Sequence, residues 1–154
     1  MIAPFLLSLS MIATDVESIR SAGEWLVQNV GSDGLFRYGF EPALDRELEG
    51  ENLVRQAGTA AALARAGAIL RDEGMTRRAR AVLARLIELR EKDREKPLAV
   101  RREFAQQQGA HPVGWGALLL LGLAELRERT PAEIHQGDAM ASFLLSHQRD
   151  DGSI

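Results

Sequence analysis

The chain lacks cysteine and has few aromatic residues and few lysines. Because none of its 154 residues is cysteine, disulfide bonds, thiolate metal sites and cysteine nucleophiles are excluded. Lysine occurs only at Lys92 and Lys96, so arginine carries almost all of the positive charge. Arginine can bind carboxylates or phosphates through two parallel hydrogen bonds, but a compositional preference of the source genome explains its abundance more simply.

The charges are nearly balanced. The formal net charge is −3 and both signs are spread along the chain, whereas binding to nucleic acid requires clustered positive charge. We therefore expect no nucleic-acid partner. The composition, with 45% hydrophobic and 27% charged residues, is that of an ordinary globular protein. The length suffices for a buried core, and we expect a single domain over residues 1–154.

The hydrophobic segment Met1–Ala13 could be mistaken for a membrane or secretion segment. It is too short to span a bilayer, and it lacks the basic residues that open a secretion signal. We expect it to form a hydrophobic arm or a partial helix packed on the rest of the protein. This favours a cytoplasmic over a secreted protein, with the remnant of a secretion signal as the alternative.

Motifs for metals and cofactors are missing as well. The three histidines, His111, His135 and His147, are widely spaced and have no ligand-like companions. No glycine loop of the phosphate-binding kind and no serine-centred nucleophile elbow occur. We therefore expect neither a metal site nor a cofactor.

One segment of the sequence occurs twice. Trp25–Val27 leads into Ser32–Phe36, and 118 positions later Phe143–Leu145 leads into Asp150–Ile154. In both copies the end of an apolar helix runs into an Asp-Gly turn, in which aspartate caps its own loop and glycine supplies a positive φ. Similarity at a fixed offset indicates one supersecondary unit that is used repeatedly. The repeat therefore describes an architecture, and we expect both turns to be structural.

Hydrophobic spacing and capping residues predict five helices. The first is expected to begin at a capping box formed by Thr14 and Glu17 and to stop at Gly31. The next three are expected over about Leu53 to Leu70, over about Thr76 to Arg90 after a turn at Gly74, and over Pro112 to Leu126. The last is expected to begin at a second capping box, formed by Thr130 and Glu133, and to end at the second Asp-Gly turn. The loops hold shorter elements. The alternation of Phe36, Tyr38 and Phe40 predicts an extended segment, and Leu98–Phe104 forms a short strand or an irregular loop.

The predicted helices differ in how much of their surface is apolar. Leu53–Leu70 is rich in glycine and alanine on several faces, which allows more than one neighbour to approach closely. Val113–Leu126 is apolar on nearly every face and fits a helix that is buried all round. Thr76–Arg90 has one apolar stripe, as an outer helix does. The order outer, inner, outer, inner, outer predicts an all-α fold of antiparallel helical hairpins, with short extended segments in the loops.

This arrangement resembles part of an α/α toroid, the superfamily of terpenoid cyclases, prenyltransferases and many glycan-processing enzymes. The ending His147–Ser153 resembles the Gln-x-x-Asp-Gly-Ser part of the repeat in squalene-type cyclases. The segment Phe36–Ala64, with Arg37–Pro42 and Asn52–Thr59, resembles toroid proteins of the sugar-processing branch, such as six-hairpin glycosidases.

Two features depart from the cyclase pattern. The Asp-x-Asp-Asp acid motif is absent, and Ile154 stands where that family has an aromatic residue. The chain also supplies fewer hairpins than the closed ring that the resemblance implies. We therefore expect a fragment of a longer protein, or a partial toroid that covers its edges by forming a homo-oligomer. A small helical domain that shares only the repeat is the alternative.

The resemblance implies a ligand pocket at the mouth of the ring, near the N-terminal ends of the inner helices. Free N–H groups and the positive end of the helix dipole independently favour anionic or hydroxyl-rich ligands at such ends. At the start of the predicted helix Leu53–Leu70 the candidates are Glu51, Asn52, Arg55, Gln56 and Thr59. At the start of the predicted helix Pro112–Leu126 they are Gln108, His111 and Trp115.

A functional interpretation assigns these residues to a sugar or carboxylate site. Arg55 would bind an acidic group, with Asn52 beside it, and Trp115 would stack on a sugar ring. Glu51 or His111 would exchange protons as the catalytic residue. The single tyrosine, Tyr38, would line the same cleft.

A structural interpretation explains the same residues without a ligand. Asn52 and Glu51 would cap the helix, and Arg55 would pair with a loop carboxylate such as Glu41 or Asp45. His111 would be a loop histidine and Trp115 part of the core, while Tyr38 would pack with Phe36 and Phe40. Glycosidases need two opposed carboxylates, and the sequence does not establish which of Glu41, Asp45 and Glu51 oppose each other.

Three hypotheses about function follow, and they leave open whether the chain is an enzyme. The first is a carbohydrate-processing or carbohydrate-binding toroid protein, which predicts a polar, aromatic-lined cleft containing Arg55, His111 and Trp115 and at least two facing carboxylates. The second is a non-catalytic helical-repeat module for protein association, which predicts that the same positions are buried or paired and that an apolar flank is exposed or dimerised. The third is an isoprenoid cyclase-like fragment, which the aromatic content of 5% and the missing acid motif disfavour.

Overall fold

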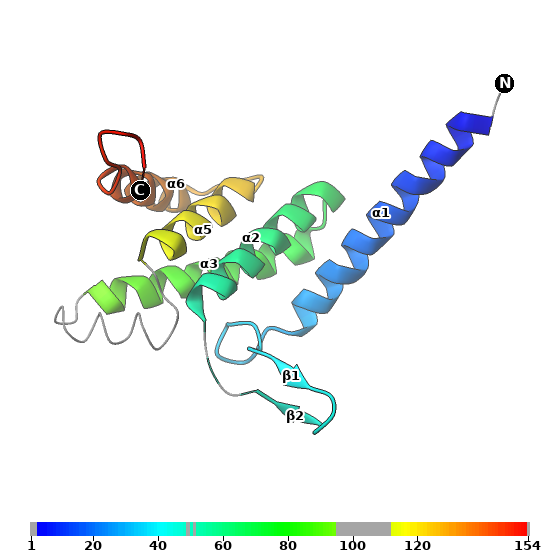
Figure 1. The fold of residues 1–154 in the computed structure, drawn as a ribbon, viewed down its shortest axis with the longest axis horizontal. Coiled ribbons are helices and arrows are strands. Elements are labelled where there is room, and N and C mark those ends of the chain that lie inside the picture. Colours follow the sequence, from blue (N-terminus) through cyan, green and yellow to red (C-terminus); the bar gives the residue numbers. More distant parts are fainter. Residues whose placement is uncertain (1–2, 49, 51, 95–111, 154) are drawn as a thin grey trace.

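The structure is a computed structural model that describes residues 3–48, 50, 52–94 and 112–153. The helices in these ranges are α1 (Ala3–Gln28), α2 (Leu53–Leu70), α3 (Glu73–Arg94), α5 (Pro112–Glu125) and α6 (Pro131–Leu145), and a short hairpin consists of β1 (Phe40–Glu41) and β2 (Arg46–Glu47). The helices pack against one another (Figure 1), which confirms the expected all-α fold. The predicted segment Leu98–Phe104 lies outside the described residues.

The helices form two layers. The inner helices α2 and α5 lie side by side. Of the outer helices, α1 packs on α2, α3 packs on both inner helices, and α6 packs on α5. Figure 1 shows that α2 and α5 run in one direction and that α1, α3 and α6 run in the opposite direction. The N-terminal ends of the two inner helices therefore lie at the same side of the molecule.

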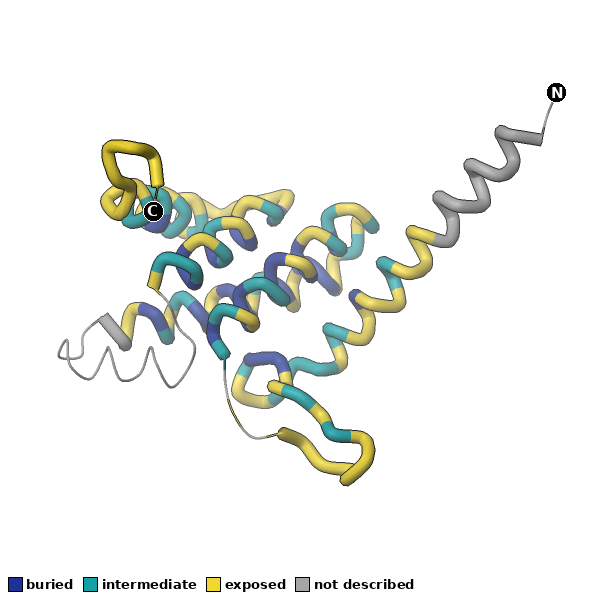
Figure 2. Tube along the Cα trace, in the orientation of Figure 1, coloured by how far each residue is buried: buried dark blue, intermediate teal, exposed yellow. Residues whose placement is uncertain are grey.

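The core lies where α2, α3 and α5 meet, and exposed residues cover the outside (Figure 2). Small residues allow these three helices to approach closely. A Cβ atom on Gly122 would lie 2.6 Å from Cδ2 of Leu83 and 3.5 Å from Cα of Ala61, so glycine permits contact with α3 and α2 at once. The largest fully buried side chains among the described residues are Leu53, Leu63, Leu83, Leu86, Leu119, Leu123, Met140 and Val82.

The first helix begins earlier than predicted. Its backbone is helical from Ala3, so Thr14 lies inside the helix and the expected capping box at its start is wrong. The alanine, leucine and methionine residues before Thr14 favour helix, and this preference outweighs a local capping bond. Figure 1 shows the N-terminal half of α1 running away from the other helices.

The turn between α2 and α3 lies before the glycine that was expected to form it. Arg71 ends α2 in the left-handed conformation, with φ of 54°. Asp72 then caps α3 by accepting a 2.9 Å hydrogen bond from the N–H of Met75. Gly74 lies inside the first turn of α3, so the prediction of a turn at Gly74 is wrong. A side-chain cap at Asp72 starts the helix before the glycine can stop it.

The helix α5 is buried on one face only. Its buried residues lie towards α2, α3 and α6, whereas Leu121 is 48% exposed and Ala117 and Ala124 are exposed as well. The expectation that this helix is buried all round is therefore wrong. Apolar residues occupy both the faces of α5 that pack against other helices and the face that carries Leu121. No described element covers the face that carries Leu121.

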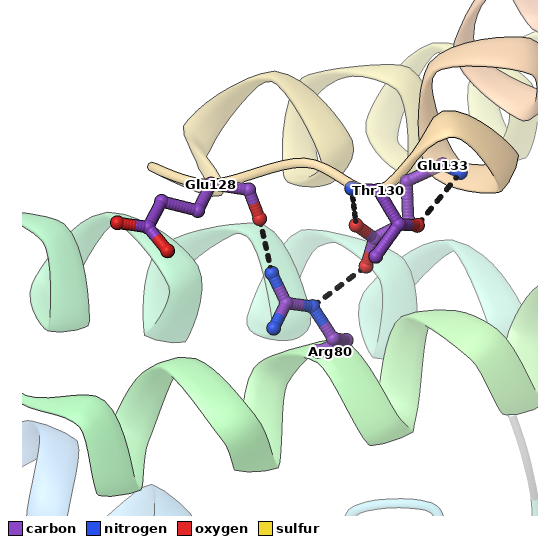
Figure 3. A network of polar contacts seen from close by, with 4 residues as sticks. All are labelled: Arg80, Glu128, Thr130 and Glu133. Carbon is purple, nitrogen blue, oxygen red and sulfur yellow. Dashed lines mark hydrogen bonds and ion pairs between the residues drawn. The ribbon is translucent and has the colours of Figure 1, made fainter.

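The start of α6 forms the predicted capping box and is anchored to α3 (Figure 3). Thr130 Oγ1 accepts a hydrogen bond from the N–H of Glu133, and Glu133 accepts one from the N–H of Thr130. Arg80 on α3 donates to Glu133 over 2.7 Å and also to the carbonyl oxygen of Glu128. Burial alone would raise the pKa of Glu133, but the bonds from Thr130 and Arg80 outweigh it and lower the pKa below its usual value.

The first Asp-Gly turn follows α1. The N–H of Gly31 donates to the carbonyl of Leu35 over 2.7 Å, and the N–H of Gly34 donates to that of Gly31 over 3.1 Å. The carboxylate of Asp33 accepts from the N–H of Leu35 over 3.1 Å, and Gly34 has φ of 84°. Aspartate therefore caps the loop, and the glycine occupies a conformation that other residues rarely adopt.

The second Asp-Gly turn, which follows α6, repeats this pattern. The N–H of Arg149 donates to the carbonyl of Ser153 over 2.7 Å, and the N–H of Gly152 donates to that of Arg149 over 2.9 Å. Asp151 accepts from the N–H of Ser153 over 2.9 Å, and Gly152 has φ of 83°. Each bond corresponds to one in the first turn, 118 positions earlier. The repeat recognised in the sequence is therefore a repeat in three dimensions.

Candidate functional site

A cavity of about 200 Å³ lies at the N-terminal end of α2. Its wall is formed by the end of α1, by the segment after the first Asp-Gly turn and by the first two turns of α2. The described residues that line it are Trp25, Leu26, Asn29, Phe36, Arg37, Tyr38, Asn52, Arg55, Gln56 and Thr59. Three of the four predicted ligand-binding residues, Tyr38, Asn52 and Arg55, are thus brought together, as is Thr59.

Gln56 holds the wall of the cavity in place. Its buried side chain accepts a hydrogen bond from the N–H of Phe36 over 2.9 Å and donates to the carbonyl of Phe36 over 2.7 Å. Phe36 also pairs with Val30 across the turn. The extended backbone therefore leaves the turn in a fixed direction, which carries Tyr38 to the mouth of the cavity.

Tyr38 and Arg55 lie against each other in the wall of the cavity. The guanidinium carbon of Arg55 lies 5.8 Å from the centre of the Tyr38 ring, within the range of a cation–π contact. Gly50 supports the ring from behind, because a Cβ atom at its position would lie 3.2 Å from Tyr38 Cε1. Since Gly50 also has φ of 136°, this close approach requires a glycine.

Arg55 forms no ion pair within the ranges that the structure describes. The structural interpretation paired it with Glu41 or Asp45, but Glu41 forms an ion pair with Arg46 instead, with 3.1 Å between Oε2 and Nη2. Neither predicted pair forms, and no described side chain accepts a hydrogen bond from the guanidinium of Arg55, which lies at the exposed surface of α2. An arginine in this situation can bind a carboxylate through two parallel bonds.

Asn52 has the structural role that was considered for it. Its Oδ1 accepts a 2.9 Å hydrogen bond from the N–H of Arg55 and so caps α2. Asn52 also lies in the wall of the cavity, at the N-terminal end of α2, where free backbone N–H groups are found. The positive end of the α2 dipole therefore adds to the charge of Arg55.

Trp25 was not selected from the sequence, yet it is the most exposed aromatic ring at this site. It is 61% exposed and lines both the cavity and an adjoining hollow of about 310 Å³, which also includes Phe40 and Glu47. Glu47 pairs with Arg37 over 3.2 Å, and both side chains are exposed. No signal in the sequence indicated this exposure, because the equivalent residue of the second copy, Phe143, packs on α5 and is only partly exposed.

The structure places Trp115 away from the cavity. Its side chain is 3% exposed and belongs to the core, with no hydrogen-bond acceptor for Nε1 among the described residues. Trp115 therefore does not share a cleft with Arg55 as the first hypothesis required. The two predicted catalytic residues, Glu51 and His111, lie outside the described residues.

The described part of the site does not present a pair of acids. No acidic side chain occurs among the described residues that line the cavity, and the acid of the adjoining hollow, Glu47, is paired with Arg37. Hydrolysis of a glycosidic bond requires two opposed carboxyl groups. Among the described residues, no cluster of histidine, aspartate and glutamate could hold a metal ion.

No described helix combines the length and the hydrophobicity that crossing a membrane requires. No protein-family model, no curated protein sequence and no solved structure matches this chain.

Proposed function

We propose that the chain binds a carboxylate-bearing sugar, of the uronic acid type, in the cavity at the N-terminal end of α2. The observation that carries the proposal is the position of Arg55, whose guanidinium has no carboxylate partner among the described residues and lies over the ring of Tyr38. A ligand carboxylate would supply that partner. The exposed ring of Trp25 offers an apolar surface for the face of a sugar, and Asn29 and Thr59 offer polar contacts.

The test is calorimetric titration of the full chain with oligosaccharides of glucuronate and galacturonate, and with neutral oligomers of glucose and galactose. We expect the acidic oligomers to bind and the neutral ones to bind about tenfold more weakly or not at all, because one charged hydrogen-bond pair contributes about that factor. Trp25 is exposed and Trp115 is buried, so a change in tryptophan emission on binding would report the cavity.

Arg55→Gln should weaken binding of the acidic oligomers about tenfold. The matched control is Arg65→Gln, because Arg65 is an exposed arginine on the same helix that does not line the cavity. Equal binding of neutral and acidic oligomers, or an equal effect of the two substitutions, would refute the proposal.

A second candidate function is protein association through the helical repeat. It is favoured by exposed apolar side chains away from the cavity, among them Ile69, Leu121 and Leu145. This candidate needs no ligand at Arg55, so the oligosaccharide titration distinguishes the two.

A further inference from the structure

The helix and Asp-Gly turn that occur twice in the chain are packed against neighbouring helices on different sides in the two copies. We refer to residues 16–35 as the first unit and to residues 134–153 as the second unit, with equivalent positions 118 apart. Because the two turns have matching hydrogen bonds, the helices before them are in the same register. The neighbours of one unit therefore indicate what fits against the other.

The second unit is covered by the inner helix that precedes it. Met140 is fully buried, and the ring of Phe143 lies 3.5 Å from the Cβ position of Gly116 on α5. The equivalent residues of the first unit are Ala22 and Trp25, which are both exposed. The described residues include no helix on this side of α1.

The first unit is covered by the hairpin that follows it, α2 and α3. Gly23 is buried, and a Cβ atom there would lie 3.7 Å from Ala66 on α2 and 2.6 Å from the sulfur of Met75 on α3. Val27, one turn later, packs against the core. Each outer helix therefore has one side for an inner helix that precedes it and one side for a hairpin that follows it.

The second unit lacks this second neighbour within the described residues. Ala141, the equivalent of Gly23, is only partly buried, and Leu145, the equivalent of Val27, is 67% exposed. Leu144 lies beside them and is partly buried. We call Ala141, Leu144 and Leu145 the α6 docking face.

We propose that the α6 docking face binds a helical hairpin of a partner protein, whose first helix is rich in glycine and alanine like α2. The argument is continuity with the interface inside this chain, since the same face of the same unit is covered by such a hairpin on α1. An inner helix with small residues fits because Ala141 is itself small and occupies the position of Gly23, whose Cβ position lies 3.7 Å from Ala66 of α2. A second copy of the chain fits less well, because its own α2 and α3 already cover its α1.

Two differences between the units define the partner more closely. Gln148 and Ser153 are polar and exposed, whereas their equivalents Val30 and Leu35 are apolar. Contact with the partner therefore ends before the second Asp-Gly turn. Ala141 also carries a Cβ atom that Gly23 lacks, so the partner needs a side chain smaller than Met75 at the facing position.

The probe is a peptide that spans Asn52–Arg94 of this same chain, with Met75→Ala to accommodate Ala141. We expect the labelled peptide to bind the full chain in a fluorescence anisotropy titration. Leu145→Asp in the full chain should weaken binding at least about tenfold, because it places a charge on a buried apolar contact. Ala139→Asp is the control on the same helix, because Ala139 and its equivalent, Ser21, are both exposed.

A fused version tests the same contact if the peptide does not fold alone. Residues 37–94, with the same Met75→Ala change, are appended after residue 154, which reproduces the spacing between α1 and α2. Leu145→Asp should then lower the free energy of unfolding of the fused chain, and Ala139→Asp should not.

Docking should also slow amide hydrogen exchange in the last turn of α6 of the fused chain. Failure in both formats, or equal effects of the two substitutions, overturns the proposal. Self-association of the full chain that Leu145→Asp abolishes overturns it too, because the occupant is then a second copy.

Discussion

The side chain of Gln56 on α2 satisfies both backbone groups of Phe36, which lies 20 residues earlier. The two bonds imitate a strand partner, since one amide side chain supplies a donor and an acceptor to the same residue. Both residues are buried, so water cannot replace either bond. This contact joins the first Asp-Gly turn to α2 and sets the position of Tyr38 at the cavity.

Replacing Gln56 with leucine should therefore lower the free energy of unfolding by more than the loss of a single hydrogen bond would. Gln56→Leu keeps the apolar volume but leaves the buried N–H and carbonyl of Phe36 without partners, at a cost of roughly 2–4 kcal/mol. The free energy of unfolding from urea denaturation measures the effect. Gln28→Leu, at an exposed position of α1, should change stability by less than about 0.5 kcal/mol. Similar values for both variants would contradict the role assigned to Gln56.

The sequence predicted α2 from its first to its last residue, and it predicted the capping box of α6. Both depend on short-range signals, namely helix propensity and a side chain that caps its own turn. The start of α1 and the turn at Gly74 were predicted wrongly because two local signals competed there. At Asp72 the capping carboxylate determined the start of α3, and the glycine that follows it was absorbed into the helix.

A substitution of Gly34 tests the conformation of the first Asp-Gly turn. Gly34→Ala has room for its Cβ atom, since Arg85 Cγ lies at an ordinary 3.5 Å, but φ of 84° should cost about 1–2 kcal/mol. Gly137→Ala is the control, because Gly137 is helical and its Cβ would meet Leu120 at an ordinary 3.8 Å. That variant should gain roughly 0.5–1 kcal/mol. Thermal unfolding followed by circular dichroism gives both values, and a stabilised Gly34→Ala variant would disprove the conformational argument.

The contacts of Glu133 with Thr130 and with Arg80 predict how stability depends on pH. The pKa of Glu133 is lower in the folded protein than its usual value of about 4.3. The folded state therefore holds this proton less tightly than the unfolded state, so the contribution of Glu133 to stability is present above pH of about 4.3. It is lost as the pH falls through the folded pKa.

Arg80→Gln should reduce stability at neutral pH and reduce the loss of stability on acidification. Urea denaturation at neutral pH and at several acidic pH values measures both effects. The control is Arg85→Gln, whose partner Glu88 is exposed and whose pair should contribute little. An unchanged pH profile in Arg80→Gln would show that the contact does not account for the lowered pKa.

The residues of the cavity were only partly predictable. Asn52, Arg55 and Thr59 were selected because helix N-termini favour polar ligands, and this reasoning depends only on their positions in α2. Trp115 was selected by the same rule, but its ring turns into the core, since hydrophobic burial determines where a tryptophan on an inner helix points. Trp25 was missed because its exposure depends on which neighbouring helices are present, and sequence spacing does not record that.

The contact of α5 with both α3 and α2 at Gly122 predicts opposite outcomes for two similar substitutions. Gly122→Ala would bring its Cβ atom to 2.6 Å from Cδ2 of the fully buried Leu83, which has little room to move, and should cost about 1–3 kcal/mol. Gly58→Ala on α2 would meet only Leu118, at an ordinary 3.6 Å, and should gain roughly 0.5–1 kcal/mol through higher helix propensity. The two free energies of unfolding, measured by urea denaturation, should therefore differ in sign. A neutral Gly122→Ala variant would mean that α3 and α5 can separate without loss, and the close packing of the two layers at this point would then not contribute to stability.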